Sequence, residues 1–185
     1  MTRFPKYAAF IAFLTVWGCG SSDKDDTAGG ADGTTEATTE TTGGILPQAG
    51  DWAIVTSGWA NDDCNAENNL LTPTSIRFAD VESTSFRNTY FDSQGQVGNT
   101  ILCSHESGDS YLCEGFTNGF SYTDVDASIS VTGVGVVLMT SETTASGSGD
   151  FVLECSGSDC GQVAGITNSG MFPCGTTLNW TAQAN

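Results

Sequence analysis

Large apolar residues alternate with small or polar ones along most of the chain after residue 50, and this pattern constrains the fold most. The alternating pairs are Trp52 with Ile54, Ile76 with Phe78, Phe86 with Tyr90, Phe151 with Leu153, and Leu178 with Trp180. Successive side chains of a β-strand point to opposite sides, so each pair marks one buried strand face. No stretch of about a dozen residues has helical periodicity. The pattern therefore predicts an all-β domain.

The spacing of strands and turns predicts the architecture. Further strands are expected at 119–123 and 127–139, and turn signals rich in Gly, Ser, Asn and Asp occur at 92–95, 117–119 and 145–148. We expect an antiparallel meander of about eight or nine strands, stapled by disulfides. The alternation leaves two arrangements open, a closed barrel and a sandwich.

Six cysteines in this region predict three disulfide bonds. They are Cys64, Cys103, Cys113, Cys155, Cys160 and Cys174. An even number suits a chain sent to an oxidising compartment. The absence of any Cys-x-x-Cys, together with a single histidine, argues against a zinc site.

One cysteine pair follows from a predicted hairpin. Strands at 100–104 and 110–114, folded about Gly108, place Cys103 opposite Cys113, within reach of a bridge. For the remaining four cysteines we expect Cys160 to pair with Cys174, and Cys64 with Cys155.

The N-terminus carries a second kind of signal. Arg3 and Lys6 precede an apolar run that is too short to cross a bilayer and that ends at Leu14-Thr-Val-Trp-Gly-Cys19. This segment resembles the lipobox of bacterial lipoproteins. The resemblance implies a cleaved signal peptide at 1–18 and a diacylglyceryl anchor on Cys19. Because Gly20 follows the cysteine, it also implies the outer membrane.

Low-complexity sequence follows Cys19. Residues 20–46 are nearly all Gly, Ser, Thr, Ala, Asp and Glu, and they contain no aromatic residue. Such a segment buries too little surface to offset the entropy of ordering. We therefore expect a disordered tether at 19–46, spanning on the order of 30 Å. A single β-rich domain is expected at 47–185.

The charge of this domain limits its partners. It holds 16 Asp and Glu against Arg77 and Arg87, with no lysine. Nucleic acid is not expected, because the domain lacks the basic surface that phosphate binding requires. The expected contacts are the membrane, through the N-terminal lipid, and a small molecule or a protein.

A local motif suggests where a small molecule would bind. Gly50-Asp51-Trp52 precedes a long loop at 58–73 and resembles the Gly-x-Trp motif of lipocalins, although the last strand lacks their arginine. The resemblance implies a barrel with this loop over its mouth. In a closed barrel Trp59, Asn61 and Asn65 would line that mouth, and the alternative role for Trp59 is to fix the loop to the body of the domain. Gly133 and Gly135 would leave room inside the barrel. The alternative is a core tryptophan in an unrelated sandwich.

The domain as a whole also resembles the six-cysteine domains of uncharacterised bacterial lipoproteins. The resemblance rests on Cys155-Ser-Gly-Ser-Asp-Cys160 and on Pro173-Cys174. It implies no activity.

Catalytic and metal-binding patterns are weak. The sequence has no Gly-x-Ser-x-Gly motif that could supply a catalytic serine to act with His105. A calcium-binding EF-hand loop starting at Asp124 is also not supported, because Ile129 stands where that loop needs a glycine and Gly135 where it needs an acidic ligand. We expect no enzyme, cofactor or metal. The leading hypothesis is binding of a small apolar or saccharide ligand. The alternatives are a structural or protein-interaction role, such as adhesion or inhibition, and thirdly a hydrolase.

The lipobox interpretation predicts that Cys19→Ser abolishes membrane attachment. Serine has no thiol to receive the diacylglyceryl group, and several acyl chains are needed for stable anchoring. The full chain should move from the membrane fraction to the soluble fraction when the envelope is separated by centrifugation. A Cys19→Ser chain that stayed in the membrane fraction would contradict the anchor.

Overall fold

A computed structural model describes residues 44–70, 72–95 and 97–185. They belong to one folded unit, 43–185. The predicted signal peptide, Cys19 and nearly all of the predicted tether lie outside the described residues. Neither helix among the described residues is long and apolar enough to cross a membrane.

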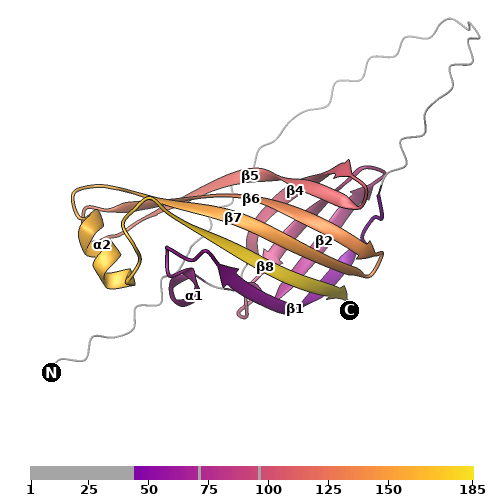
Figure 1. Cartoon of the computed structure of the whole chain (residues 1–185), viewed down its shortest axis with the longest axis horizontal. Coiled ribbons are helices and arrows are strands. Elements are labelled where there is room, and N and C mark those ends of the chain that lie inside the picture. Colours follow the sequence, from indigo (N-terminus) through magenta and orange to yellow (C-terminus); the bar gives the residue numbers. More distant parts are fainter. Residues whose placement is uncertain (1–43, 71, 96) are drawn as a thin grey trace, which may run out of the picture. The chain divides into compact units, whose positions relative to one another are not determined.

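Eight antiparallel strands form a closed barrel (Figure 1). Each strand pairs with the next along the chain, and the last pairs with the first. The strands are β1 (Gly50–Ala60), β2 (Ser75–Glu82), β3 (Ser85–Phe91), β4 (Val97–Ser107), β5 (Ser110–Ser121), β6 (Ser128–Ser141), β7 (Thr144–Ser156) and β8 (Cys174–Ala184). The helices are α1 (Ala66–Asn69) and α2 (Cys160–Thr167). The predicted all-β meander is thus confirmed, and the barrel is the correct one of the two arrangements.

Several local predictions need correction. The turn at 92–95 is confirmed, since the N–H of Gly95 donates to the carbonyl of Asp92 at 3.0 Å. The turns expected at 117–119 and 145–148 are wrong, because both segments lie inside long strands that pair with β6. Of the strand expected at 119–123, residues 119–121 are the end of β5 and residues 122–123 lie outside any strand. Helix α2 was not predicted, because Val163 is its one buried residue and leaves no apolar stripe to detect.

Aromatic side chains fill the barrel. Rings of Trp52, Phe78, Phe86 and Tyr111 follow one another with centroids 4.7–5.1 Å apart. The inner side of Gly147 is covered by the Trp180 indole. An eight-stranded barrel has an interior that side chains can just fill, and here the glycine backbone gives the indole its space.

The expectation that Gly133 and Gly135 leave room inside is wrong. A Cβ at Gly133 would lie 2.7 Å from the ring of Phe116 and 2.9 Å from that of Phe151, so two aromatic rings already occupy the space. At Gly135 a Cβ would meet the carbonyl oxygen of Ser148 at 3.1 Å. These glycines allow close packing instead of lining a cavity.

A short N-terminal strap lies across the core. The N–H of Ile45 donates to Asp109 Oδ1 at 2.9 Å, and the hydroxyl of Tyr111 donates to the carbonyl of Ile45 at 3.0 Å. Farther along the strap, Trp52 Nε1–H donates to the carbonyl of Gln48 at 2.9 Å. Ile45 and Leu46 pack against the core. Among the described residues, packing against the core therefore already includes residues 45 and 46, before the predicted boundary at 47.

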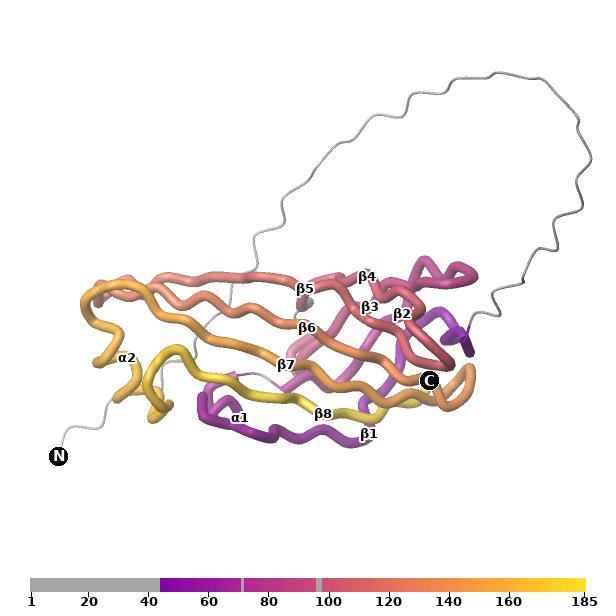
Figure 2. Tube along the Cα trace, turned by 45° about the horizontal axis from the view of Figure 1, so that its top comes forward, coloured from indigo at the N-terminus to yellow at the C-terminus, as the bar shows by residue number. Residues whose placement is uncertain are grey.

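The barrel wall splits on one side. β1 pairs with β2 only through Gly50–Ala53, and β4 pairs with β5 only through 103–107. In contrast, β5, β6, β7, β8 and β1 remain paired farther along as a five-stranded extension. Figure 2 shows these strands side by side, with α2 at the far end. A second hydrophobic cluster, which includes Ile129, Leu153 and Val163, lies in this extension.

The disulfides are partly as predicted. Cys103–Cys113 is confirmed, because the two residues face each other in the β4–β5 register with Cα atoms 3.9 Å apart. The other two predicted pairs are wrong.

The true partners are Cys64 with Cys174 and Cys155 with Cys160. The N–H of Asp63 donates to the carbonyl of Gly175 at 3.1 Å, so the loop after β1 lies against the start of β8 and brings Cys64 to Cys174. Cys155 and Cys160 flank the turn between β7 and α2.

Replacing Gly147 tests the packing of the barrel. Gly147→Ala places a methyl group against the Trp180 ring, and we expect the free energy of unfolding to fall by about 1–3 kcal/mol. Gly58→Ala is the matched control, because nothing lies within 4 Å of a Cβ there. Urea unfolding measures both. Equal stability of the two variants would contradict the filled interior.

Candidate functional site

The residues predicted to line a barrel mouth make contacts within the protein. Trp59 Nε1–H donates to Thr72 Oγ1 at 3.2 Å, and the Trp59 ring lies 6.0 Å from that of Phe151. Asn65 Nδ2–H donates to the carbonyl of Thr167 at 3.0 Å, which ties the loop before α1 to the end of α2. Asn61 is exposed, with a left-handed φ of 49°. Their role in ligand binding stays a prediction.

A small polar group lies inside the barrel. Asn88 Nδ2–H donates to the hydroxyl of Tyr90 at 3.4 Å, while Asn88 Oδ1 is buried without a partner among the described residues. Burial raises the pKa of Tyr90 to about 12, and hydrogen bonds with Trp180 and Asn88 offset part of that shift. The phenol is therefore neutral at physiological pH, where it acts as a hydrogen-bonding group and not as a base.

Two acidic side chains, one in the rejected EF-hand segment and one in the loop after β1, make structural contacts. Asp126 Oδ2 accepts from the N–H and the hydroxyl of Ser158 at 3.0 and 2.9 Å, and these bonds lower the pKa of Asp126. Asp62 accepts from the N–H groups of Ala66 and Glu67 at the start of α1. Within the described ranges, no three His, Cys, Asp or Glu side chains form a group able to hold a metal ion.

The outer wall of the barrel carries an exposed aliphatic surface. Val134, Val136 and Leu138 alternate along β6, and their exposed fractions are 46%, 37% and 45%. Leu112 of β5 pairs with Val136 and is 47% exposed. We call these four residues the outer apolar patch. Exposure of so many adjacent aliphatic side chains is typical of an interaction surface.

A shallow depression of about 580 Å³ adjoins the outer apolar patch. The strand register explains its shape: Val136 pairs with Ser148, Ser148 with Asn179, and Asn179 with Gly58. The lining residues are Thr56, Ser57, Gly58, Val136, Leu138, Ser146, Gly147, Ser148, Asn179, Trp180 and Thr181. Short side chains on β7 thus lie between the taller aliphatic residues of β6 and the polar residues of β8.

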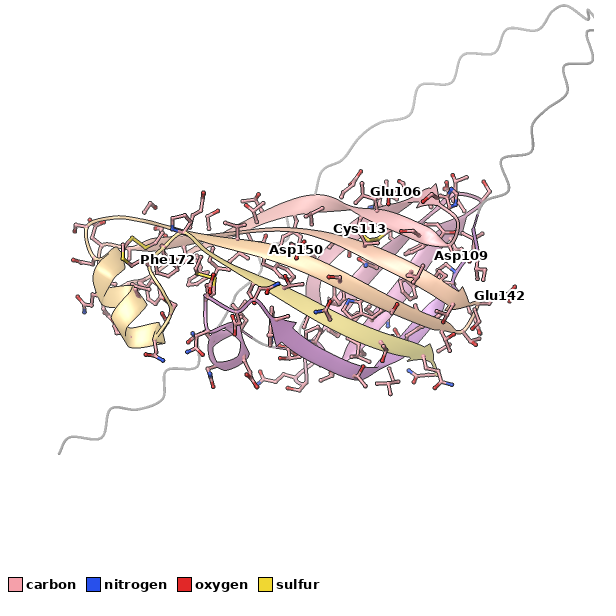
Figure 3. The ribbon with its side chains drawn as sticks, in the orientation of Figure 1. Glu106, Asp109, Cys113, Glu142, Asp150 and Phe172 are labelled. Atoms are coloured by element: carbon pink, nitrogen blue, oxygen red, sulfur yellow. A yellow bond between two sulfur atoms is a disulfide. The ribbon has the colours of Figure 1, made fainter. Side chains whose placement is uncertain are left out.

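Charge is absent from this depression although the domain is strongly acidic. All of its lining residues are uncharged. Glu106, Asp109 and Glu142 lie at one end of the barrel (Figure 3). The two arginines form exposed ion pairs, Arg77 with Asp51 at 2.6 Å and Arg87 with Asp80 at 3.4 Å. The surface therefore combines a neutral, partly apolar depression with acidic surroundings, which include Asp150, the partner of Val134 on β7.

Sequence reasoning missed the outer apolar patch, although a signal was present. Residues 134–139 are apolar at nearly every position, whereas a strand with one solvent-exposed face should alternate between apolar and polar residues. The inward side chains in this run are Val137 and Met139, which are both 1% exposed. The surplus apolar residues are those on the outer face.

No protein-family model, curated protein or solved structure matches the chain. The fold and site define a disulfide-stapled, eight-stranded barrel with a filled interior and an apolar outer wall.

The pKa of Tyr90 predicts a loss of stability at high pH. The folded-state pKa of about 12 lies above the usual value of 10.0, so the stabilisation is complete below pH 10 and is lost as the pH rises toward 12. Tyr90→Phe should abolish the highest-pH step in a titration that follows tyrosinate absorbance. A titration unchanged by this substitution would contradict the assignment.

Proposed function

We propose that this protein is a non-enzymatic binding module that recognises another protein through the outer apolar patch. A lipid on Cys19 would hold it in the cell envelope, in the outer membrane. The observation that carries the proposal is the exposed run on β6 with Leu112 beside it. The aromatic filling of the barrel also favours contact outside the barrel over a ligand inside it.

The energetics suit a protein partner. Burying a valine or leucine side chain completely contributes about 1.5–3 kcal/mol, so four half-exposed ones supply several kcal/mol on association. The neighbouring Ser146, Ser148, Asn179 and Thr181 offer hydroxyl and amide groups for hydrogen bonds at the border of the contact. An apolar centre with a polar rim is the usual composition of a protein interface.

The acidic surroundings specify the partner's charge. Glu106, Asp109 and Glu142 are not matched by any free cation, since both arginines of the described residues are paired with aspartates. A partner with an apolar centre and basic edges would be steered to the wall and held there. Such binding should weaken as the salt concentration rises.

Binding of a small apolar or saccharide ligand at the barrel mouth is a second proposal. The observation in its favour is the pair of partly exposed rings, Trp59 and Phe151. Native mass spectrometry of protein isolated from its host distinguishes the two proposals, because a co-purified small molecule would favour the barrel mouth.

A photo-crosslinking residue placed in the outer apolar patch tests the first proposal. The full chain carrying p-benzoylphenylalanine at Leu138 should crosslink to a discrete protein in intact envelopes. Adding Val136→Asp to the same chain should reduce the crosslink at least ~10-fold, because a charge must then be desolvated at the interface.

Ile166→Asp is the matched control. Ile166 is also exposed, at 71%, but it lies on α2, at the far end of the five-stranded extension (Figure 2). This variant should leave the crosslink unchanged, and thermal unfolding should be similar for both aspartate variants. Absence of any protein crosslink at Leu138, or equal loss with both aspartates, would refute the assignment.

A further inference from the structure

The split in the barrel wall leaves one side of β5 without a strand partner. β4 pairs with Cys113 and the residues before it, whereas β6 pairs with β5 as far as Ser121. We call residues 114–121 the open edge. Among the described residues no strand continues the sheet beyond this edge (Figure 1).

The hydrogen-bonding groups of the open edge follow from its register. The N–H of Tyr122 donates to the carbonyl of Ala127 at 3.0 Å, so Phe120, Asn118 and Phe116 also direct their backbone groups toward β6. Thr117, Gly119 and Ser121 consequently direct theirs away from the sheet. An unpaired row of this kind is a template for another strand.

The sequence of the open edge is complementary to itself. If two copies run antiparallel with Asn118 facing Asn118, Phe116 of each copy faces Phe120 of the other. Phe116, Asn118 and Phe120 are all partly exposed on the inner face of β5. Facing aromatic pairs stabilise antiparallel strands, and two facing amides can hydrogen-bond to each other.

The charges along the open edge are compatible with the antiparallel register in which Asn118 faces Asn118. Glu114 is the single ionisable residue between 114 and 121, and it would face Tyr122 of the other copy. No like charges are directly opposite one another, although the rest of the domain is acidic. That general repulsion is screened over about 8 Å at physiological ionic strength.

We propose that the open edge binds a second copy of this chain, forming a two-fold symmetric dimer through antiparallel β5 strands. The five-stranded extensions of the two copies then form one continuous sheet. This inference is independent of the partner proposed for the outer apolar patch. Salt ions screen the repulsion between the acidic side chains of the two copies, so the affinity of the dimer should increase with salt concentration. Binding of a basic partner should show the opposite salt dependence.

A cysteine at the two-fold axis tests the register. In Asn118→Cys the two residues 118 form a close, non-hydrogen-bonded pair, whose Cβ atoms lie about 4.5–5.5 Å apart and can be bridged. Mild oxidation of the full chain in membranes should give a disulfide-linked dimer on non-reducing gels. Thr132→Cys, exposed on β6 and one strand away from the open edge, should give at least ~5-fold less.

A pair of Gly119 substitutions tests the backbone contact without a new cysteine. Gly119→Pro removes an N–H that points to the open side and leaves the bonds to β6 intact. The full chain, extracted in detergent, should then sediment as a monomer. Gly119→Ala keeps the N–H, and its Cβ would lie 3.4 Å from the carbonyl oxygen of Ile129, an ordinary contact, so it should remain dimeric.

Four results would overturn the proposal. The first is equal dimer yield from the two cysteine variants, and the second is a Gly119→Pro chain that stays dimeric. The third is an unsubstituted chain that is monomeric. The fourth is crosslinking of residue 118 to a different protein. Each of these results would leave the crosslinking test at Leu138 unaffected, so the dimer and the protein partner of the outer apolar patch are tested independently.

Discussion

Contact between the Trp180 indole and the backbone of Gly147 is the constraint on which the rest of the structure depends. An eight-stranded barrel encloses little space, and Trp180 fits inside it because the residue that it faces on β7 has no side chain. Gly133 serves the rings of Phe116 and Phe151 in the same way. With the interior filled, the residues left for recognition are those on the outer wall, at the open edge and in the loops.

The split between β4 and β5 arises because β4 leaves β5 beyond Cys103 and stays paired with β3. β2 and β3 are short, whereas β6 and β7 continue and carry the second hydrophobic cluster, which Cys64–Cys174 and Cys155–Cys160 fasten to α2 and to the loop after β1. The same extension that needs these disulfides also exposes the open edge. The stabilising and the interacting features of this region therefore have one structural origin.

Sequence patterns predicted the features that depend on local periodicity. The all-β class followed from alternation, and Cys103–Cys113 followed from the symmetry of one hairpin. The pairing of Cys64 with Cys174 depends on a long-range contact between a loop and β8, which no local signal records. Gly147 was misread as a turn residue, because a glycine that makes space for an aromatic ring looks the same in sequence as one that permits a turn.

The distribution of charge explains why the outer wall and the open edge remain available. A domain with 16 acidic residues and two arginines repels copies of itself over most of its surface, which favours solubility. Exposed aliphatic residues and unpaired strands ordinarily promote aggregation. Here the surrounding acidic side chains oppose random association. Contact at Val136 or at Gly119 is therefore favoured only when the geometry keeps the acidic side chains apart, or when the partner supplies basic residues that neutralise them.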